Sequence, residues 1–93
     1  LLGKILQDFT KTENNRLKNV ILDFIDEFDI VLNDNKLEAF TKELFLYDDN
    51  IILKMLNIIQ KANYKIVINT LMKILDSRNL EIVNKVKDII KKE

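Results

Sequence analysis

The chain contains no cysteine, histidine, tryptophan or proline, and it has a single glycine, Gly3. Without cysteine it forms no disulfide, thiolate nucleophile or sulfur-ligated metal site. Without histidine it lacks the side chain that most often serves as a general base. A chain with one glycine also has no glycine-rich loop to bring backbone amides against a phosphate. We therefore predict no enzymatic activity, no cofactor, no bound metal and no small-molecule substrate.

The scarcity of glycine and proline also bears on the fold, because tight turns between strands normally use these residues. An all-β fold is therefore disfavoured. The longest unbroken apolar run, residues 44–47, is far shorter than the ~20 residues that span a bilayer. We expect an intracellular, cytoplasmic protein without membrane contact. The 93 residues are one domain by length, and a start at leucine leaves open that they are a fragment of a longer chain.

The formal net charge is zero, but the two halves of the chain differ. Residues 1–47 hold six Lys/Arg and nine Asp/Glu, a net −3, whereas residues 48–93 hold nine and six, a net +3. A nucleic-acid-binding domain usually has a net basic balance, which this chain lacks. Charge therefore favours a protein partner over nucleic acid.

Apolar residues recur with helical spacing nearly throughout the chain. The pattern predicts six helices, over residues 2–12, 15–32, 35–47, 50–62, 64–76 and 79–91. The fourth is apolar nearly all round, which is typical of a central helix packed on more than one side. Polar breaks at residues 14–15, 33–35, 48–50, 63 and 76–77 can cap the free amides of the helix that follows each of them. The fold class is therefore all-α.

The apolar pattern repeats at an offset of 43 residues. Stacked helical repeats have this kind of self-similarity. The matching residues are Val31, Leu32, Leu37, Glu38, Phe40 and Lys42, which recur as Ile74, Leu75, Leu80, Glu81, Val83 and Lys85. Two sets of three helices, about residues 1–47 and 48–93, resemble the HEAT/armadillo class of α-helical repeats. The proline and the glycine that are common in those repeats are missing, which leaves an irregular six-helix bundle as the alternative.

Several polar and aromatic residues are candidates for a functional role. The carboxylates of Asp23, Asp26 and Glu27, with Asp29 nearby, converge on one helical face. They form a solvated face, an acidic patch for a basic partner, or a cation site. Tyr47 and Tyr64 either stack on bases or pack with the core. A basic set lies in the second half of the chain: Lys73, Arg78, Lys85, Lys87, Lys91 and Lys92.

A repeat stack offers a broad surface rather than a deep pocket, so we predict a non-catalytic protein–protein interaction module, an adaptor or a subunit of a larger assembly. Its partner is another protein or a further copy of itself. The alternative is a nucleic-acid-associated accessory protein that uses residues 85–92. The flanks are apolar, with Leu1, Leu2, Ile5 and Leu6 at one end and Ile89 and Ile90 at the other. They predict that an end packs against another chain or a missing segment. The resemblance implies a binding surface on the third helix of each set, formed by Lys36, Thr41, Lys42, Asn84, Lys85 and Asp88.

Overall fold

The computed structural model describes residues 2–91, so Leu1 and Lys92 of the sequence predictions lie outside it. Within this range the chain forms six α-helices and three 3-10 helices and contains no strand, which confirms the all-α prediction. The α-helices are α1 (Leu2–Lys11), α2 (Asn15–Glu27), α3 (Asp34–Thr41), α4 (Asp49–Ile59), α5 (Ile68–Lys73) and α6 (Leu80–Lys91). The 3-10 helices are η1 (Leu44–Leu46), η2 (Tyr64–Val67) and η3 (Ile74–Asp76).

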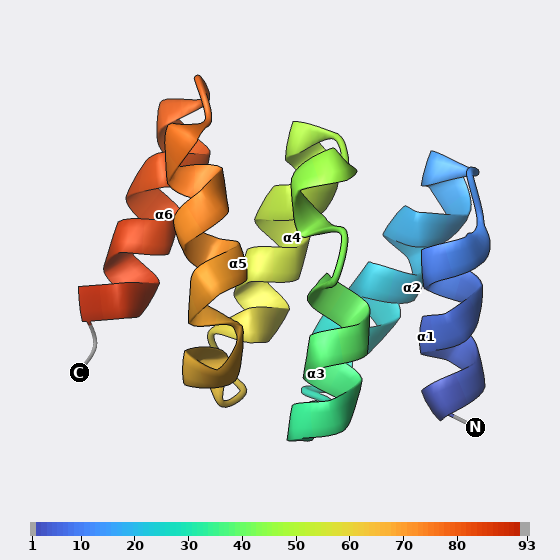
Figure 1. Cartoon of the computed structure of the whole chain (residues 1–93). Helices are drawn as coiled ribbons and strands as arrows, with labels where there is room; N and C mark the ends of the chain where they lie inside the picture. The colour runs from blue at the N-terminus through green and yellow to red at the C-terminus, as the bar shows by residue number, and fades with distance from the viewer. Residues whose placement is uncertain (1, 92–93) are drawn as a thin grey trace.

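The helices alternate in direction along the chain and form two layers (Figure 1). Helices α1, α3 and α5 make one layer, in which α1 contacts α3, and α3 contacts η2. Helices α2, α4 and α6 make the other, in which α4 contacts both α2 and α6. The three helices of this second layer run parallel to one another, because each follows a helix of the first layer that runs the opposite way. The molecule is therefore a row of three antiparallel helix pairs.

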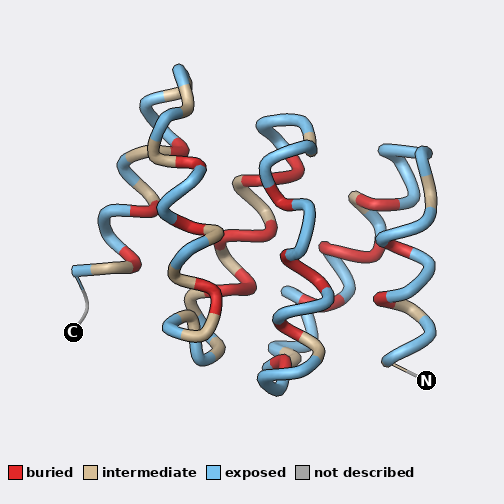
Figure 2. The backbone as a smooth tube through the Cα atoms, in the orientation of Figure 1, coloured by how far each residue is buried: buried red, intermediate tan, exposed pale blue. Residues whose placement is uncertain are grey.

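The hydrophobic core lies between the two layers (Figure 2). Helix α4 is its centre, and every residue from Ile51 to Ile59 is buried or half-buried. The prediction of a central fourth helix is confirmed. The pair Leu6 and Phe9 on α1 is matched 31 residues later by Leu37 and Phe40 on α3, and all four side chains are buried. Successive pairs of helices thus bury corresponding positions.

The starts of the helices follow the polar breaks that the sequence predicts. The side-chain oxygen of Asn14 accepts hydrogen bonds from the backbone amides of Arg16 and Leu17, at 2.9 and 3.2 Å, and so caps α2. Asn33 caps α3 in the same way. At α6 the cap is Asn79, whose Oδ1 accepts from the amide of Glu81 at 2.9 Å. The predicted break at residues 76–77 lies just before it.

Helix α2 ends at Glu27, five residues before the predicted end. Asp29 has a φ of 50°, in the left-handed region, which asparagine and aspartate tolerate better than most residues. The amide of Ile30 donates to the carbonyl of Ile25 and that of Asp29 to the carbonyl of Asp26, a Schellman motif. Half-buried Ile30 then packs against the core, and the chain leaves the helix at this point.

Two other predicted helices are irregular. The predicted helix over residues 35–47 divides into α3 and η1 after Thr41, whose hydroxyl donates to the carbonyl of Leu37 at 2.9 Å. Bonds of this kind back to the preceding turn often bend helices. The predicted helix over 64–76 is one helical stretch with 3-10 geometry at both ends. Its first turns hold several β-branched residues, which lose side-chain freedom in an α-helix: Ile66, Val67, Ile68 and Thr70.

The 43-residue offset can be compared with the order in which the helices alternate between the two layers. Helices α2, α4 and α6 begin at residues 15, 49 and 80, so corresponding helices start 34 and 31 residues apart. The 43-residue offset instead relates residues of α2 and α3 to residues of α5 and α6, and it therefore equates helices of opposite layers. Amphipathic helices share apolar spacing wherever they pack, so this offset matched helix faces without matching positions in the fold.

Candidate interaction surface

The six residues predicted to bind a partner do not form one surface. Lys36 and Lys42 lie on α3 and at its end, in the first layer, whereas Asn84, Lys85 and Asp88 lie on α6, in the second. Thr41 is buried, with 1% of its surface exposed, because its side chain points into the core and bonds to the carbonyl of Leu37. The prediction of Thr41 as a surface residue is corrected accordingly.

Three of the remaining predicted residues, Lys36, Lys85 and Asp88, border two separate hollows, and Lys42 borders a third hollow of about 240 Å³. Lys36 lies beside a groove of about 450 Å³ between α1 and α3, whose other walls include Leu6, Thr10 and Phe40. Lys85 and Asp88 border a smaller hollow of about 330 Å³, together with Gln60 and Lys91. A small-molecule site usually combines an enclosed apolar cleft with a few convergent polar groups. The two hollows are half open to solvent, so neither has this character.

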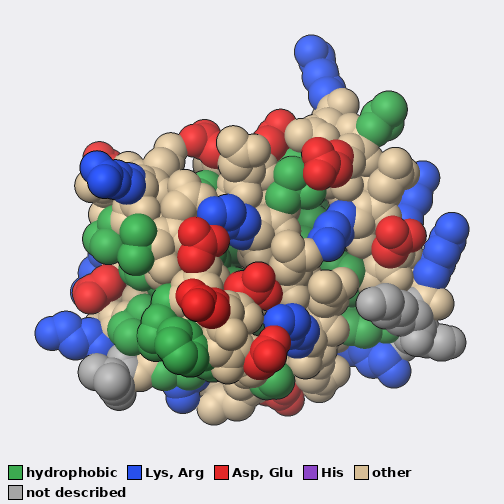
Figure 3. All heavy atoms as spheres, turned by 180° about the vertical axis from the view of Figure 1, so that it is seen from behind, with side chains coloured by type: hydrophobic (Ala, Val, Ile, Leu, Met, Phe, Trp, Pro, Cys, Tyr) green, Lys and Arg blue, Asp and Glu red, His purple; other side chains and the backbone are tan. Residues whose placement is uncertain are grey.

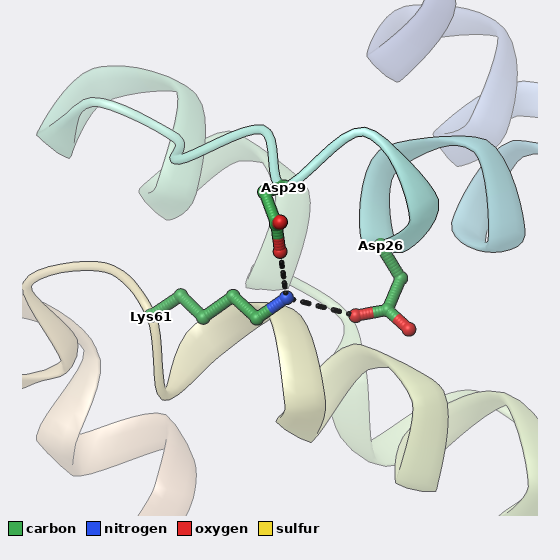
Figure 4. Close-up of polar contacts among 3 residues, drawn as sticks. All are labelled: Asp26, Asp29 and Lys61. Carbon is green, nitrogen blue, oxygen red and sulfur yellow. Dashed lines mark hydrogen bonds and ion pairs between the residues drawn. The ribbon is translucent and has the colours of Figure 1, made fainter.

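Acidic residues on and just after α2 pair with lysines on and just after α4, and Figure 4 shows Lys61 between Asp26 and Asp29. Lys61 Nζ lies 3.1 Å from Asp26 Oδ1 and 2.8 Å from Asp29 Oδ1, and Lys54 Nζ lies 2.8 Å from Asp23 Oδ1. The hydrogen bond from Lys61, followed by its charge, lowers the pKa of Asp29. The bonds to Asp29 and Asp26 raise the pKa of Lys61. Three of the four acidic residues, Asp23, Asp26 and Asp29, are therefore paired with lysines on or just after α4.

A cation site, one of the three interpretations of the acidic residues, needs several ligands in one place. Within residues 2–91, no group of three or more Asp, Glu, His or Cys side chains is placed to hold a metal ion.

Sequence reasoning missed Lys54 and Lys61 because they come from a helix that is distant in sequence and becomes a neighbour only through packing.

Both tyrosines pack against the core. Tyr47 meets the ring of Phe9 edge-on, with the ring centroids 5.5 Å apart, and Phe9 also contacts Phe40. The ammonium of Lys18, a buried lysine on α2, lies 4.5 Å from the centroid of the Tyr47 ring, a cation–π contact. Burial, and next the nearby charge of Glu43, raise the pKa of Tyr47. Half-buried Tyr64 also packs against the core, which favours the core interpretation of both residues over base stacking.

The most exposed line of apolar side chains lies on α2. Leu17, Val20, Phe24 and Phe28, here called the α2 stripe, follow one another at intervals of three or four residues and so share one face of the helix. All four are exposed, Val20 to 59% and Phe28 to 64%. The rings of Phe24 and Phe28 contact each other, with centroids 4.9 Å apart. Figure 3 shows the molecule from behind, with hydrophobic side chains gathered at the lower left, toward the end of the row that holds α1 and α2.

The α2 stripe is exposed because α2 is the outermost helix of its layer. Helix α2 contacts α1 and α4, and its buried residues, Ile21, Leu22 and Ile25 among them, belong to the core, whereas the residues of the α2 stripe are exposed. Helix α6 ends the same layer on the other side, and its exposed positions are mainly polar. They are Glu81, Asn84, Lys87, Asp88 and Lys91, together with Leu80 at its first residue. In this layer the outer helix at one end, α2, is therefore apolar on its exposed side, and the outer helix at the other end, α6, is mainly polar.

The sequence predicted apolar ends at different residues. Leu6 and Ile89 are buried, and Leu2, Ile5 and Ile90 are partly buried against the core. Those side chains stabilise the chain itself. The residues of the α2 stripe recur with the same helical spacing as buried Ile21, so spacing alone does not separate them from the core. A signal was present, because the apolar residues of α2 span a wider arc than packing on α1 and α4 covers.

Comparison with protein-family models, with curated proteins and with solved structures finds no match to this chain. Within the described range, no helix combines the length and the apolar character that crossing a bilayer requires.

Proposed function

We propose that the chain is a non-catalytic protein–protein interaction module that binds its partner along the α2 stripe. The observation that carries this proposal is the line of four exposed, large apolar side chains on the end helix of the row. Monomeric soluble proteins rarely leave such contiguous apolar surface uncovered, and where they do it often marks a binding site. The exposed parts of the two phenylalanines alone amount to on the order of 200 Å².

The architecture supports this function. We propose that the three helix pairs form a short helical repeat array, in keeping with the resemblance to the HEAT/armadillo class. In such arrays each unit buries its apolar face against the next, and the terminal units generally carry polar outer faces. Helix α6 has such a face and α2 does not. A helix or another apolar element of a partner, packed on α2, supplies the missing neighbour.

The alternative of nucleic-acid binding through residues 85–92 has less support. Asp88 lies among the lysines of this segment, and Glu81 precedes them on α6. Phosphate binding by such a surface would show a steep loss of affinity with rising salt. We place the proposed module in the cytoplasm, as the composition predicts.

Site-specific photo-crosslinking tests the proposed surface. Phe28 is replaced by p-benzoylphenylalanine, and the chain is irradiated in cell lysate. Leu80, which is 73% exposed at the other end of the row, receives the same residue as the matched control. We expect a discrete crosslinked product from position 28 that disappears when Val20→Glu is added, and no such product from position 80. Equal products from both positions, or none from position 28, would contradict the proposal.

A further inference from the structure

We propose that the α2 stripe binds a second copy of this chain, with the two α2 helices packed antiparallel about a two-fold axis. This inference rests on the proposed function and names the partner. A two-fold contact must be self-complementary, so that residue i meets residue j while j meets i. The α2 helix satisfies this requirement in the spacing of its apolar residues and in the charges along one edge.

The apolar residues of the α2 stripe pair with one another around one centre. Leu17 and Phe28 are equidistant from position 22.5, and Val20 and Phe24 from position 22. An axis at this point sets Leu17 of each copy against Phe28 of the other and Val20 against Phe24. The two centres differ by half a residue, less than ~1 Å along a helix that rises 1.5 Å per residue. Each small side chain thus faces a large one, which lets the two faces interdigitate.

The charges beside the α2 stripe match the same axis. Arg16 and Glu27 are 11 residues apart, about three helical turns, so both lie on the same edge of the stripe. Both are exposed, and neither takes part in an ion pair within residues 2–91. Their midpoint is position 21.5, next to the centre of the apolar pairs. In a two-fold antiparallel pair this edge meets its own counterpart, so Arg16 of each copy faces Glu27 of the other.

The size of the surface sets the strength of the association. A stable interface buries about 800 Å² on each partner, and smaller ones are typical of weak or transient contacts. One helix face with four apolar side chains is smaller than this. We therefore expect a dissociation constant on the order of 100 µM, with two Arg16–Glu27 contacts that select the antiparallel orientation.

Sedimentation velocity on the 93-residue chain, from about 10 µM to about 1 mM, tests the dimer. The wild type is expected to shift from monomer to dimer over this range. Phe28→Glu should remain monomeric throughout, and Leu80→Glu, the matched control on α6, should behave as the wild type. Circular dichroism on each variant checks that the helices are intact, because the substituted side chains are exposed.

A charge exchange tests the register. Arg16→Glu and Glu27→Arg each place like charges opposite each other and should weaken the dimer about tenfold or more. The double variant, which exchanges the two charges, should restore it. A dimer that both single variants leave unchanged, or that the double variant fails to restore, contradicts the antiparallel arrangement. A dimer that persists in Phe28→Glu contradicts the use of the α2 stripe.

The two proposals can fail separately. A wild type that stays monomeric at all concentrations, with a Val20-dependent crosslink from position 28 to a different protein, overturns the second copy as partner and leaves the interaction module in place. A monomer without any crosslink from position 28 overturns both. A crosslink from position 28 in the purified chain, at twice the monomer mass, supports both.

Discussion

Helices α4 and α2 are similar in length and both are rich in large apolar residues, yet they end in opposite environments. Helix α4 has α2 on one side and α6 on the other, and from Ile51 to Ile59 it has no fully exposed residue. Helix α2 has α4 on one side only, and the α2 stripe stays in solvent. The difference comes from place in the row rather than from composition. An apolar face is buried in the core or exposed to solvent according to whether a neighbour covers it.

Truncation of one apolar residue on each of these two helices should give the largest difference in unfolding free energy. Leu56 on α4 is fully buried, so Leu56→Ala should cost about 2–5 kcal/mol of unfolding free energy through lost burial and a cavity. Val20 on α2 is 59% exposed, and Val20→Ala should change stability by less than about 0.5 kcal/mol. Urea denaturation followed by circular dichroism measures both. Similar losses at the two sites would mean that α2 is also covered on its outer side.

Removal of a capping side chain should lower the unfolding free energy by an intermediate amount. Here the larger loss is expected for α2 and the smaller one for α4, the reverse of the core truncations. Asn14 caps α2 with two hydrogen bonds, whereas the side chain of Asp48, at the start of α4, makes no capping bond within the described residues. Asn14→Ala should therefore cost about 1 kcal/mol. Asp48→Ala should cost less, because it removes only an exposed bond from Asn15. A larger loss for Asp48→Ala in the same denaturation assay would contradict this comparison.

A polar substitution within the α2 stripe should reduce the exposed apolar surface without changing the stability of the fold. Val20→Lys should leave the unfolding free energy within about 0.5 kcal/mol of the wild type, because the side chain is exposed. It should also reduce the fluorescence of a dye that binds exposed apolar surface, since the apolar line is interrupted. Leu80→Lys on α6 is the control, and its dye fluorescence should change less, because Leu80 is a single apolar residue on a polar face. Equal decreases would show that the dye does not report on the α2 stripe.

The smallest effect is expected at the ion pairs that join the two helices, because exposed ion pairs contribute little. The lowered pKa of Asp29 means that its stabilising contribution is present above pH ~3.9 and is lost as the pH falls. The raised pKa of Lys61 means that its contribution is present below pH ~10.4 and is lost as the pH rises. Both pKa shifts arise from the contact between Lys61 and Asp29, so their contributions to stability are not added together.

Lys61→Met should therefore flatten the profile of melting temperature against pH at both extremes. Lys87→Met, on the exposed face of α6, is the matched control and should leave the profile unchanged. An unchanged profile for Lys61→Met would show that the contact with Asp29 and Asp26 contributes nothing measurable to stability.

Much of the fold could be predicted from local sequence signals. The apolar period located all six helices. The fourth predicted helix is apolar nearly all round, which predicted its central place. Asn14 and Asn33 lie in predicted capping positions. The early end of α2 was missed because Asp29 adopts a left-handed conformation that is more often taken by glycine. Apolar spacing leaves the grouping of the helices open, because it records which face of a helix is buried and not which helix buries it.

The candidate surface was harder to predict for the same reason. Phe24 and Ile25 are adjacent and both apolar, and only the position of α4 decides that Ile25 is buried and Phe24 exposed. Thr41 looked like a surface residue because threonine is polar, but its hydroxyl finds an acceptor in its own helix and the rest of the side chain packs in the core. In each case the deciding quantity is the set of neighbours in space.

The polar outer face of α6 limits how copies of this chain can assemble. Head-to-tail stacking into a filament requires two different adhesive surfaces, one at each end, so that every added copy leaves another end free. Here the α6 end offers charged and amide side chains, with Leu80 as a lone apolar residue. Any assembly held by the α2 end alone is therefore closed after one contact, and its mass stops growing at a fixed value however concentrated the solution becomes.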